Sequence, residues 1–163
     1  MATIGHLAAG FAVSRGSASR PSWTDTAIIT LAAAAPDVDF LMGIEHRGIT
    51  HSAGAAIAVG VGVALFYGLA GLPRARRVAG LAGLAVVSHV LLDLITAESP
   101  VPALWPFIDA EFVLDVTLLP SAPLMPRLLT AEGALNAAGE VIWSGMLVIG
   151  AIVIVRRISS WHS

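Results

Sequence analysis

Long apolar stretches separated by short polar ones dominate the pattern of residues along this chain. Residues 53–72 contain no charged side chain, and a helix of that length crosses about 30 Å of hydrocarbon. Residues 78–97 form a second run, interrupted by polar residues only in its second half, and residues 141–155 form a third. These three runs predict transmembrane helices.

Two less regular apolar stretches precede them. Residues 26–42 are apolar apart from threonines and two aspartates, and we expect them to span the membrane with a local break near Pro36. Residues 2–13 are too short to span without help, so we expect a half-spanning or re-entrant helix there. The pattern therefore predicts an all-α, polytopic transmembrane bundle of about five membrane segments.

Composition agrees with a location in the bilayer. Hydrophobic residues make up 56% of the 163 positions, charged residues make up 12%, and the mean hydropathy is +0.83. No polar linker or internal repeat divides the chain, so we expect one integral-membrane domain, residues 1–163. Within it we place an outer loop at about 98–136, which carries an interfacial segment, and the last membrane helix at about 137–155.

The arginines predict an orientation. Short cytoplasmic loops accumulate lysine and arginine, and a five-segment chain with its N-terminus outside would have seven of its nine arginines on one face. That face should be cytoplasmic, together with the C-terminus. The arginines form no basic patch with interleaved aromatic residues, so we do not expect nucleic acid as a partner. The seven are Arg15, Arg20, Arg74, Arg76, Arg77, Arg156 and Arg157.

A series of histidines and aspartates is embedded in this apolar sequence, and the five-segment topology brings all its members to the outer side. Ionisable side chains are costly at membrane depth unless they are paired, solvated or bound to a cation. Cysteine is absent, so imidazole and carboxylate groups are the available ligands for one or two divalent ions, with zinc preferred and manganese second. The series is His6, Asp37, Asp39, His46, His51, His89 and Asp93.

Spacing divides the series into smaller motifs. His89 and Asp93 are four residues apart, so on a helix they share a face and can reach the same ion, or the carboxylate can orient the imidazole. A hydrogen-bonded pair without a metal is the alternative. We expect the break near Pro36 to bring at least one of Asp37 and Asp39 inward, although a solvated acid pair in a turn is equally compatible with this motif.

The stretch HRGITHS lies immediately before the clearest apolar run. His46 should lie on the irregular approach to that helix and His51 at its start, where Thr50 or Ser52 can cap it. Arg47 is the candidate for binding an anionic oxygen, because its planar guanidinium matches phosphate. An interfacial loop whose arginine meets lipid headgroups is the alternative.

The segment after the last motif contains aromatic and acidic residues. Trp105, Pro106 and Phe107 have the character of interfacial anchors or of a wall for an acyl chain, the former being favoured. Beyond them we expect a solvated acidic face, formed by Asp109, Glu111 and Asp115.

The motifs together resemble a known family, the predicted membrane-bound metal-dependent hydrolases of bacterial inner membranes. The resemblance rests on His6, PDVD at 36–39, HRGITHS at 46–52 and SHVLLDLIT at 88–96, and it covers roughly the first 107 residues. It implies that the seven residues of the series act at a metal centre and that the activity is hydrolytic. The chain departs from the pattern after Thr96, where Ala-Glu-Ser-Pro stands and we expect a glycine.

Hydrolysis of a phosphoester fits these parts best. Metal ions would lower the pKa of water and polarise the scissile group, and Arg47 would stabilise charge on oxygen. We therefore predict a membrane-embedded phosphohydrolase that acts on a lipid or lipid-linked phosphoester at the outer boundary of the bacterial inner membrane. Arg47, Asp39 and Thr50 are the catalytic candidates.

Two other functions remain as alternatives. Buried histidines and aspartates in membrane helices also mark metal-ion and proton pathways in transporters and channels. Such a pathway should continue into the inner halves of the spans, where we find no ionisable residue in the sequence. A non-catalytic membrane module that a metal merely stabilises is the second alternative. The oligomeric state is left open.

Overall fold

The structure is a computed structural model that describes residues 3–17, 21–43, 46–96, 99–114 and 130–160. Within these ranges the chain forms α-helices, one 3-10 helix and no β-strand, apart from the isolated bridge between Val101 and Phe112. The all-α prediction is confirmed for this part of the chain. Predictions that concern Ala2, Arg20, Ala97, Glu98 and Asp115 lie outside the described residues.

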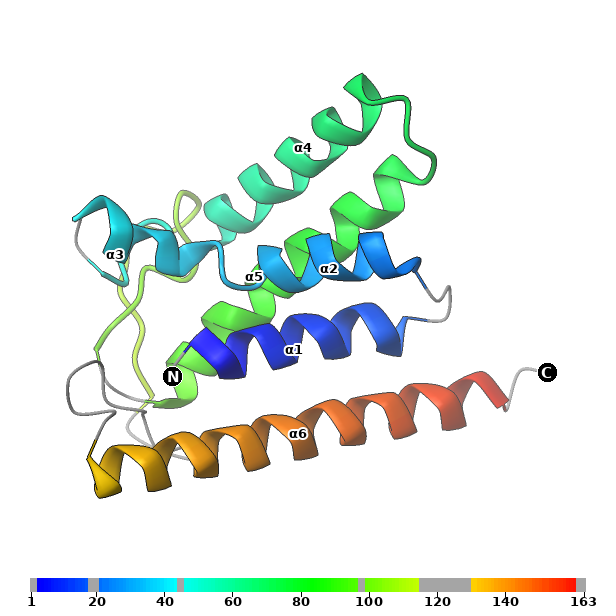
Figure 1. Cartoon of the computed structure of the whole chain (residues 1–163). Helices are drawn as coiled ribbons and strands as arrows, with labels where there is room; N and C mark the ends of the chain where they lie inside the picture. The colour runs from blue at the N-terminus through cyan, green and yellow to red at the C-terminus, as the bar shows by residue number, and fades with distance from the viewer. Residues whose placement is uncertain (1–2, 18–20, 44–45, 97–98, 115–129, 161–163) are drawn as a thin grey trace.

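α5 is the central element of the bundle. α1 and α2 pack against it, α4 lies along another side of it, and α6 runs along α1 (Figure 1). Every other long helix therefore touches α5 or touches a helix that does. In chain order the elements are α1 (Thr3–Gly16), α2 (Trp23–Ala32), the 3-10 helix η1 (Pro36–Val38), α3 (Asp39–Met42), α4 (Ala53–Leu69), α5 (Ala75–Thr96) and α6 (Ala131–Ser160).

The predicted segment 26–42 is not one helix. α2 ends at Ala32, and the chain passes through a turn into η1, which begins at Pro36. Proline lacks the N–H that a helix interior needs but is tolerated in a first turn, so the break near Pro36 is confirmed. The ten residues of α2 rise about 15 Å, which is half of the hydrocarbon thickness.

Other helix boundaries differ from the predicted ones by several residues. α4 ends before 72 because Gly71 adopts φ +63°, a left-handed conformation that closes a helix. α6 has 30 residues and begins earlier than the predicted 137, because the Thr130 hydroxyl accepts a hydrogen bond from the Gly133 N–H and caps an alanine-rich first turn. This helix is thus longer than the predicted one.

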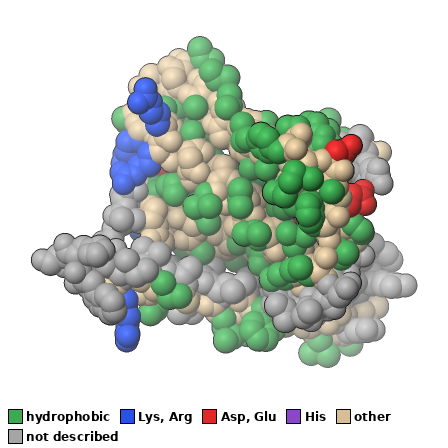
Figure 2. Space-filling model, turned by 180° about the vertical axis from the view of Figure 1, so that it is seen from behind, with side chains coloured by type: hydrophobic (Ala, Val, Ile, Leu, Met, Phe, Trp, Pro, Cys, Tyr) green, Lys and Arg blue, Asp and Glu red, His purple; other side chains and the backbone are tan. Residues whose placement is uncertain are grey.

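One helix among the described residues, Ala75–Ile95 within α5, is long and apolar enough to cross a membrane. α4 is also apolar but has 17 residues. The number of spans therefore stays a prediction. Figure 2 shows apolar side chains over much of one face, with arginines at one end of the molecule and acidic side chains at the other.

The loop after α5 forms no helix in its described part, 99–114. It docks on the start of α4 instead, where Ala53 N–H donates to the Ala103 carbonyl at 2.9 Å and Gly54 N–H donates to the Trp105 carbonyl at 2.8 Å. A Cβ at Gly54 would lie 2.9 Å from the Trp105 ring, so only glycine permits this approach. Trp105 therefore anchors the loop to α4.

α1 and α2 approach each other closely at Gly10. A Cβ there would lie 2.6 Å from the Cβ of Ala33 and 3.1 Å from the Cα of Thr30, which is closer than side chains tolerate. The absence of a side chain at Gly10 lets the two helices touch. This contact places the end of α2 beside α5, where the site described next is built.

Candidate metal centre

All seven residues of the histidine and aspartate series meet at one end of the bundle. The start of α1, the η1–α3 segment, the loop before α4 and the last turns of α5 lie at that end (Figure 1). Contacts of 3.1 to 3.8 Å connect every member to the rest. Buried members are His6, Asp39, His51, His89 and Asp93, while Asp37 and His46 are half-buried.

His89 is held by the backbone carbonyl that follows α2. Its Nδ1 lies 2.7 Å from the oxygen of Ala33, which can only accept, so Nδ1 carries the proton and donates. Nε2 of His89 then carries the lone pair, and it is buried without a hydrogen-bond partner. It lies 3.2 Å from Oδ2 of Asp93, so the predicted pair does share one face of α5. His89 has the tautomer of a metal ligand.

His51 is held in the same tautomer by hydrogen bonds through Thr50 to Asp39. Thr50 donates its hydroxyl proton to Oδ2 of Asp39 at 3.0 Å, and the same hydroxyl oxygen lies 3.0 Å from Nδ1 of His51. Nδ1 therefore donates to Thr50, and Nε2 carries the lone pair. Nε2 of His51 is buried without a hydrogen-bond partner and lies 3.4 Å from Oδ2 of Asp93.

Two imidazole nitrogens each lie 3.2 to 3.8 Å from the same two carboxylate oxygens. Oδ1 of Asp37 lies 3.6 Å from Nε2 of His89 and 3.8 Å from Nε2 of His51. A tetrahedral zinc ion with bonds of 2.0 to 2.2 Å holds its ligand atoms about 3.3 to 3.6 Å apart. Lone pairs that face one another in a buried site repel unless a cation lies between them. These four atoms therefore fit a divalent ion.

Asp39 is a neighbour of these atoms, and both of its carboxylate oxygens accept hydrogen bonds. Its Oδ1 accepts from Nδ1 of His46 at 3.1 Å, and its Oδ2 accepts from Thr50 and from the backbone N–H of Arg47 at 3.3 Å. We expected Asp39 among the metal ligands. The structure gives it hydrogen bonds that orient the residues around the centre, because the turn after Pro36 directs its carboxylate toward the loop before α4.

Ser52, rather than Thr50, caps α4. The Ser52 hydroxyl accepts a hydrogen bond from Ala55 N–H at 3.2 Å, so Ser52 is the cap among the two residues that the sequence offered. Thr50 bonds to Asp39 instead. His51 lies just before the helix, as expected from the sequence.

Arg47 turns inward. Its guanidinium donates to Oδ1 of Asp93 at 3.2 Å and to the carbonyl of Ser99 at 3.1 Å, and the residue is 3% exposed. This burial removes the alternative of an arginine that reaches out to lipid headgroups. Arg47 also has φ +66°, a left-handed conformation that costs a non-glycine residue about 1 kcal/mol or more. The surrounding contacts hold the backbone there.

His6 and His46 lie beside the converging atoms. The His6 ring stacks on His89 with centroids 3.5 Å apart and planes inclined by 18°, and its Nε2 lies 3.5 Å from Oδ1 of Asp93. Neither ring nitrogen of His6 has a hydrogen-bond partner. His46 stacks on Phe40 at 3.8 Å. Both residues therefore contact other members of the series, His6 through His89 and Asp93 and His46 through Asp39.

A polar pocket of about 480 Å³ opens beside the centre. Arg47 and His46 line one side of it, and the loop after α5 lines the other through Ser99, Asp109 and Glu111. The two acids are exposed, as expected for a solvated face. The pocket gives a polar molecule a route to Arg47.

A second buried polar cluster lies at the opposite end of the bundle, and we did not predict it. The Tyr67 hydroxyl donates to Oδ1 of Asp25 at 2.6 Å, and Ser22 N–H donates to the other oxygen of Asp25 at 3.2 Å. We expected no ionisable residue in the inner halves of the spans, and Tyr67 is one. The capping pattern Ser-x-x-Asp at Ser22 was the available signal for Asp25, whereas nothing local indicates its pairing with Tyr67.

Comparison with known proteins identifies a family. No curated protein and no solved structure matches the chain. The family described as YdjM inner membrane protein matches residues 1–163, so the match includes the C-terminal third, where the sequence motifs indicated no relationship. This agrees with the membrane location predicted from the apolar runs. The chain belongs to the YdjM inner membrane protein family.

Proposed function

We propose that this protein is a metal-dependent hydrolase of the inner membrane and that its substrate is a phosphoester of a lipid or a lipid-linked compound. The observation that carries the proposal is the pair of buried Nε2 atoms, of His51 and His89, that lack a hydrogen-bond partner and lie 3.2 and 3.4 Å from the same oxygen of Asp93. A divalent cation would satisfy these atoms together, and histidine with aspartate suits zinc or manganese.

The residues around that cation have separate roles. His51, His89, Asp93 and Asp37 would hold the ion, which would supply Lewis acidity at the scissile group. The Ala33 carbonyl keeps His89 in its ligating tautomer. Thr50, backed by Asp39, does the same for His51. Asp39 and Thr50 are therefore positioning residues in this proposal.

Arg47 supports a phosphate substrate. It lines the polar pocket and also contacts Asp93, so an anionic group that enters the pocket meets a permanent positive charge beside the ion. Negative charge that develops on phosphoryl oxygens would be stabilised there. The guanidinium is fixed in advance by the Ser99 carbonyl and Asp93.

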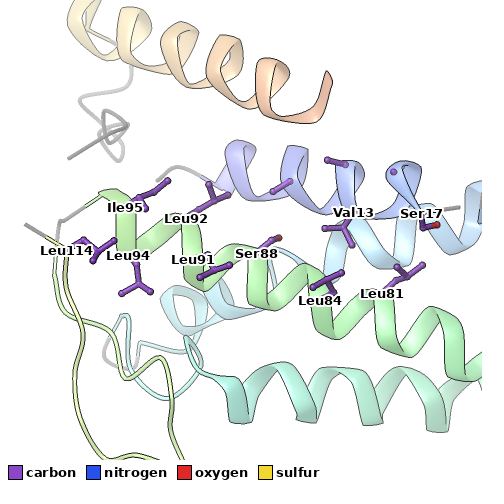
Figure 3. Close-up of a pocket in the computed structure, with 13 residues that line it drawn as sticks. Val13, Ser17, Leu81, Leu84, Ser88, Leu91, Leu92, Leu94, Ile95 and Leu114 are labelled. Carbon is purple, nitrogen blue, oxygen red and sulfur yellow. The ribbon is translucent and has the colours of Figure 1, made fainter. Parts of the chain in front are cut away.

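An apolar groove supports a substrate with a lipid chain. The groove has a volume of about 620 Å³ and runs between α1 and α5, with Val13 and Ser17 on one wall and a set of α5 side chains between Leu81 and Ile95, mostly leucines, on the other (Figure 3). At one end it reaches Leu92 and Leu94, which flank Asp93 on α5. A chain lying along this groove would bring an amphiphilic molecule to the end of the bundle that carries the centre.

The arginines support a site on the outer side. Arg15 lies in the last turn of α1 and Arg157 in the last turn of α6, and Arg74 precedes α5. These three positions lie at the end of the bundle opposite the centre (Figure 1). If the basic end is cytoplasmic, the centre faces outward.

The proposal is tested with purified protein in lipid nanodiscs. We expect zinc- or manganese-dependent release of phosphate or of a phosphorylated headgroup from phospholipids or polyprenyl phosphates, and we expect His89→Ala to abolish it. Tyr67→Phe is the control, because that hydroxyl bonds to Asp25 at the opposite end of the bundle. If no metal-dependent turnover occurs on either lipid class, the hydrolase proposal fails.

Metal transport is tested with the same purified protein reconstituted into liposomes. A transport path would have to continue from the centre to the opposite end, where the buried pair Asp25–Tyr67 is closed by its own hydrogen bond. Metal uptake that depends on His89, in the absence of turnover, would favour a transporter over a hydrolase.

A further inference from the structure

We infer that the centre is mononuclear. One divalent ion is bound by His51, His89 and Asp93, with Asp37 at the fourth position, and Arg47 rather than a second ion satisfies the other oxygen of Asp93. This inference rests on the proposed function, and it determines the number of ions and the ligand set that this function uses.

Three of the four ligand atoms form a tight group. Oδ2 of Asp93 lies 3.2 Å from Nε2 of His89 and 3.4 Å from Nε2 of His51, close to the edge of a zinc tetrahedron. The fourth atom, Oδ1 of Asp37, is farther from both nitrogens, at 3.6 and 3.8 Å. The Asp37 side chain is also the most exposed of the four, at 12%. Asp37 thus marks the side on which substrate or water can replace a protein ligand.

His6 cannot share the ion of His89. An imidazole binds a metal through a lone pair in the plane of its ring, and the ion lies 2.0 to 2.1 Å from the nitrogen. The two rings are stacked at 3.5 Å with nearly parallel planes, so an ion in the plane of His89 lies roughly 3 Å outside the plane of His6. The group His6, His89 and Asp93 looks like a metal triad by distance alone, but its ring geometry excludes one shared ion.

A second ion near His6 would compete with the positively charged guanidinium of Arg47. It would need Oδ1 of Asp93, which lies 3.5 Å from Nε2 of His6 but already accepts a hydrogen bond from Arg47 at 3.2 Å. The Ser99 carbonyl fixes that guanidinium in place. A divalent ion on the same oxygen would lie next to a group that never loses its positive charge.

The part of the centre near His46 offers no better position for a second ion. His46 and His51 lie near Asp37 within 4.8 Å, which again looks like a triad. However, Nδ1 of His51 donates to Thr50, so His51 has a single ligating nitrogen, Nε2, and the first ion uses it. A second ion there would have only His46 and a shared Asp37 left as ligands. The arrangement therefore favours one ion for the whole cluster.

The test is the metal-to-chain ratio of detergent-purified protein, dialysed against a series of zinc concentrations and measured by elemental analysis. We expect wild type to saturate at one ion per chain and His6→Ala to saturate at one as well. His89→Ala should stay near zero at concentrations that saturate wild type, and Ser88→Ala should match wild type. Thermal unfolding confirms that each variant is folded; if His6→Ala is not, His6→Gln takes its place.

The outcomes separate this inference from the proposed function. Two ions in wild type and one in His6→Ala would overturn the mononuclear assignment but leave a metal-dependent hydrolase standing. A ratio of zero in folded His6 variants, with one ion in wild type, would make His6 a ligand and would also overturn it. A ratio near zero in wild type would overturn both proposals.

Discussion

Two groups of buried polar side chains lie at opposite ends of the same apolar bundle, and they differ in how their atoms are satisfied. At one end the buried side chains of Tyr67 and Asp25 bond to each other at 2.6 Å, and the exposed Ser22 bonds to Asp25 at 3.1 and 3.2 Å. At the other end the Nε2 atoms of His51 and His89 are buried without hydrogen-bond partners. Buried polar groups in native proteins are nearly always paired, so unpaired ones require an explanation.

The difference distinguishes a structural cluster from a binding cluster. The Tyr67 group completes itself and ties the start of α2 to the end of α4. In the histidine group the Nδ1 atoms of His51 and His89 have hydrogen-bond partners, because Thr50 and the Ala33 carbonyl accept from them. The Nε2 atoms of the same rings lie against carboxylate oxygens. This contrast supports the proposal that the histidine group binds a cation and that the Tyr67 group does not.

Removing one residue from each cluster and measuring zinc affinity by calorimetry tests whether only the histidine group binds metal. His51→Ala removes a ligand, so we expect the affinity to fall by more than about 100-fold. Tyr67→Phe removes one hydroxyl at the other end, and we expect an unchanged affinity. Equal losses in the two variants would show that the clusters do not act separately.

Metal removal should affect stability through one cluster only. At a metal concentration 100-fold above Kd, binding stabilises the folded state by about 2.7 kcal/mol, so a chelator should lower the Tm of wild type by several degrees. Tyr67→Phe should keep this shift and His89→Ala should lose it, as measured by thermal unfolding in detergent. A chelator shift that persists in His89→Ala would place the metal elsewhere.

A smaller effect is expected from a residue that only orients a ligand. Thr50→Val keeps the shape of the side chain but removes the hydroxyl that receives the Nδ1 proton of His51. We expect zinc affinity to fall by about 10- to 100-fold with one ion still bound at saturation. Thr50→Ser retains the hydroxyl and should retain most of the affinity. An unchanged affinity in Thr50→Val would contradict the role given to the Thr50–Asp39 pair.

We expect the smallest effect on stability from a substitution at the end of the bundle that contains Tyr67 and Asp25. Ser14 donates to the Thr26 hydroxyl at 2.9 Å across α1 and α2, and both residues are buried. Ser14→Ala should cost about 1 kcal/mol in the free energy of unfolding, with no change in zinc stoichiometry. The control is Ser88→Ala, whose hydroxyl bonds within one helix. A change in metal binding by Ser14→Ala would connect the two ends.

Much of the site could be predicted from the sequence because its signals are local. The four-residue spacing of His89 and Asp93 follows from helix geometry, and the break at Pro36 follows from the chemistry of proline. Convergence of all seven residues followed from combining the apolar runs with the arginine positions. These inferences needed only periodicity and charge.

The parts that could not be predicted depend on tertiary packing. The partner of His89 is a backbone carbonyl, that of Ala33, which lies 56 positions away and has no side-chain signature. The inward turn of Arg47 depends on Asp93 and on Ser99, which is 52 positions distant. Tyr67 and Asp25 are separated by 42 positions. The number of spans also needs information about the bilayer that length and composition do not contain.

Gly10 has a consequence for how mutational data on this protein are interpreted. It carries no chemistry, yet its bare Cα sets the approach of α1 to Ala33, and Ala33 fixes His89. His6 lies one helical turn before Gly10. In a saturation scan that scores activity, even alanine at position 10 should rank with losses of metal ligands. An inert glycine would then be mistaken for a catalytic position unless metal content were measured beside activity.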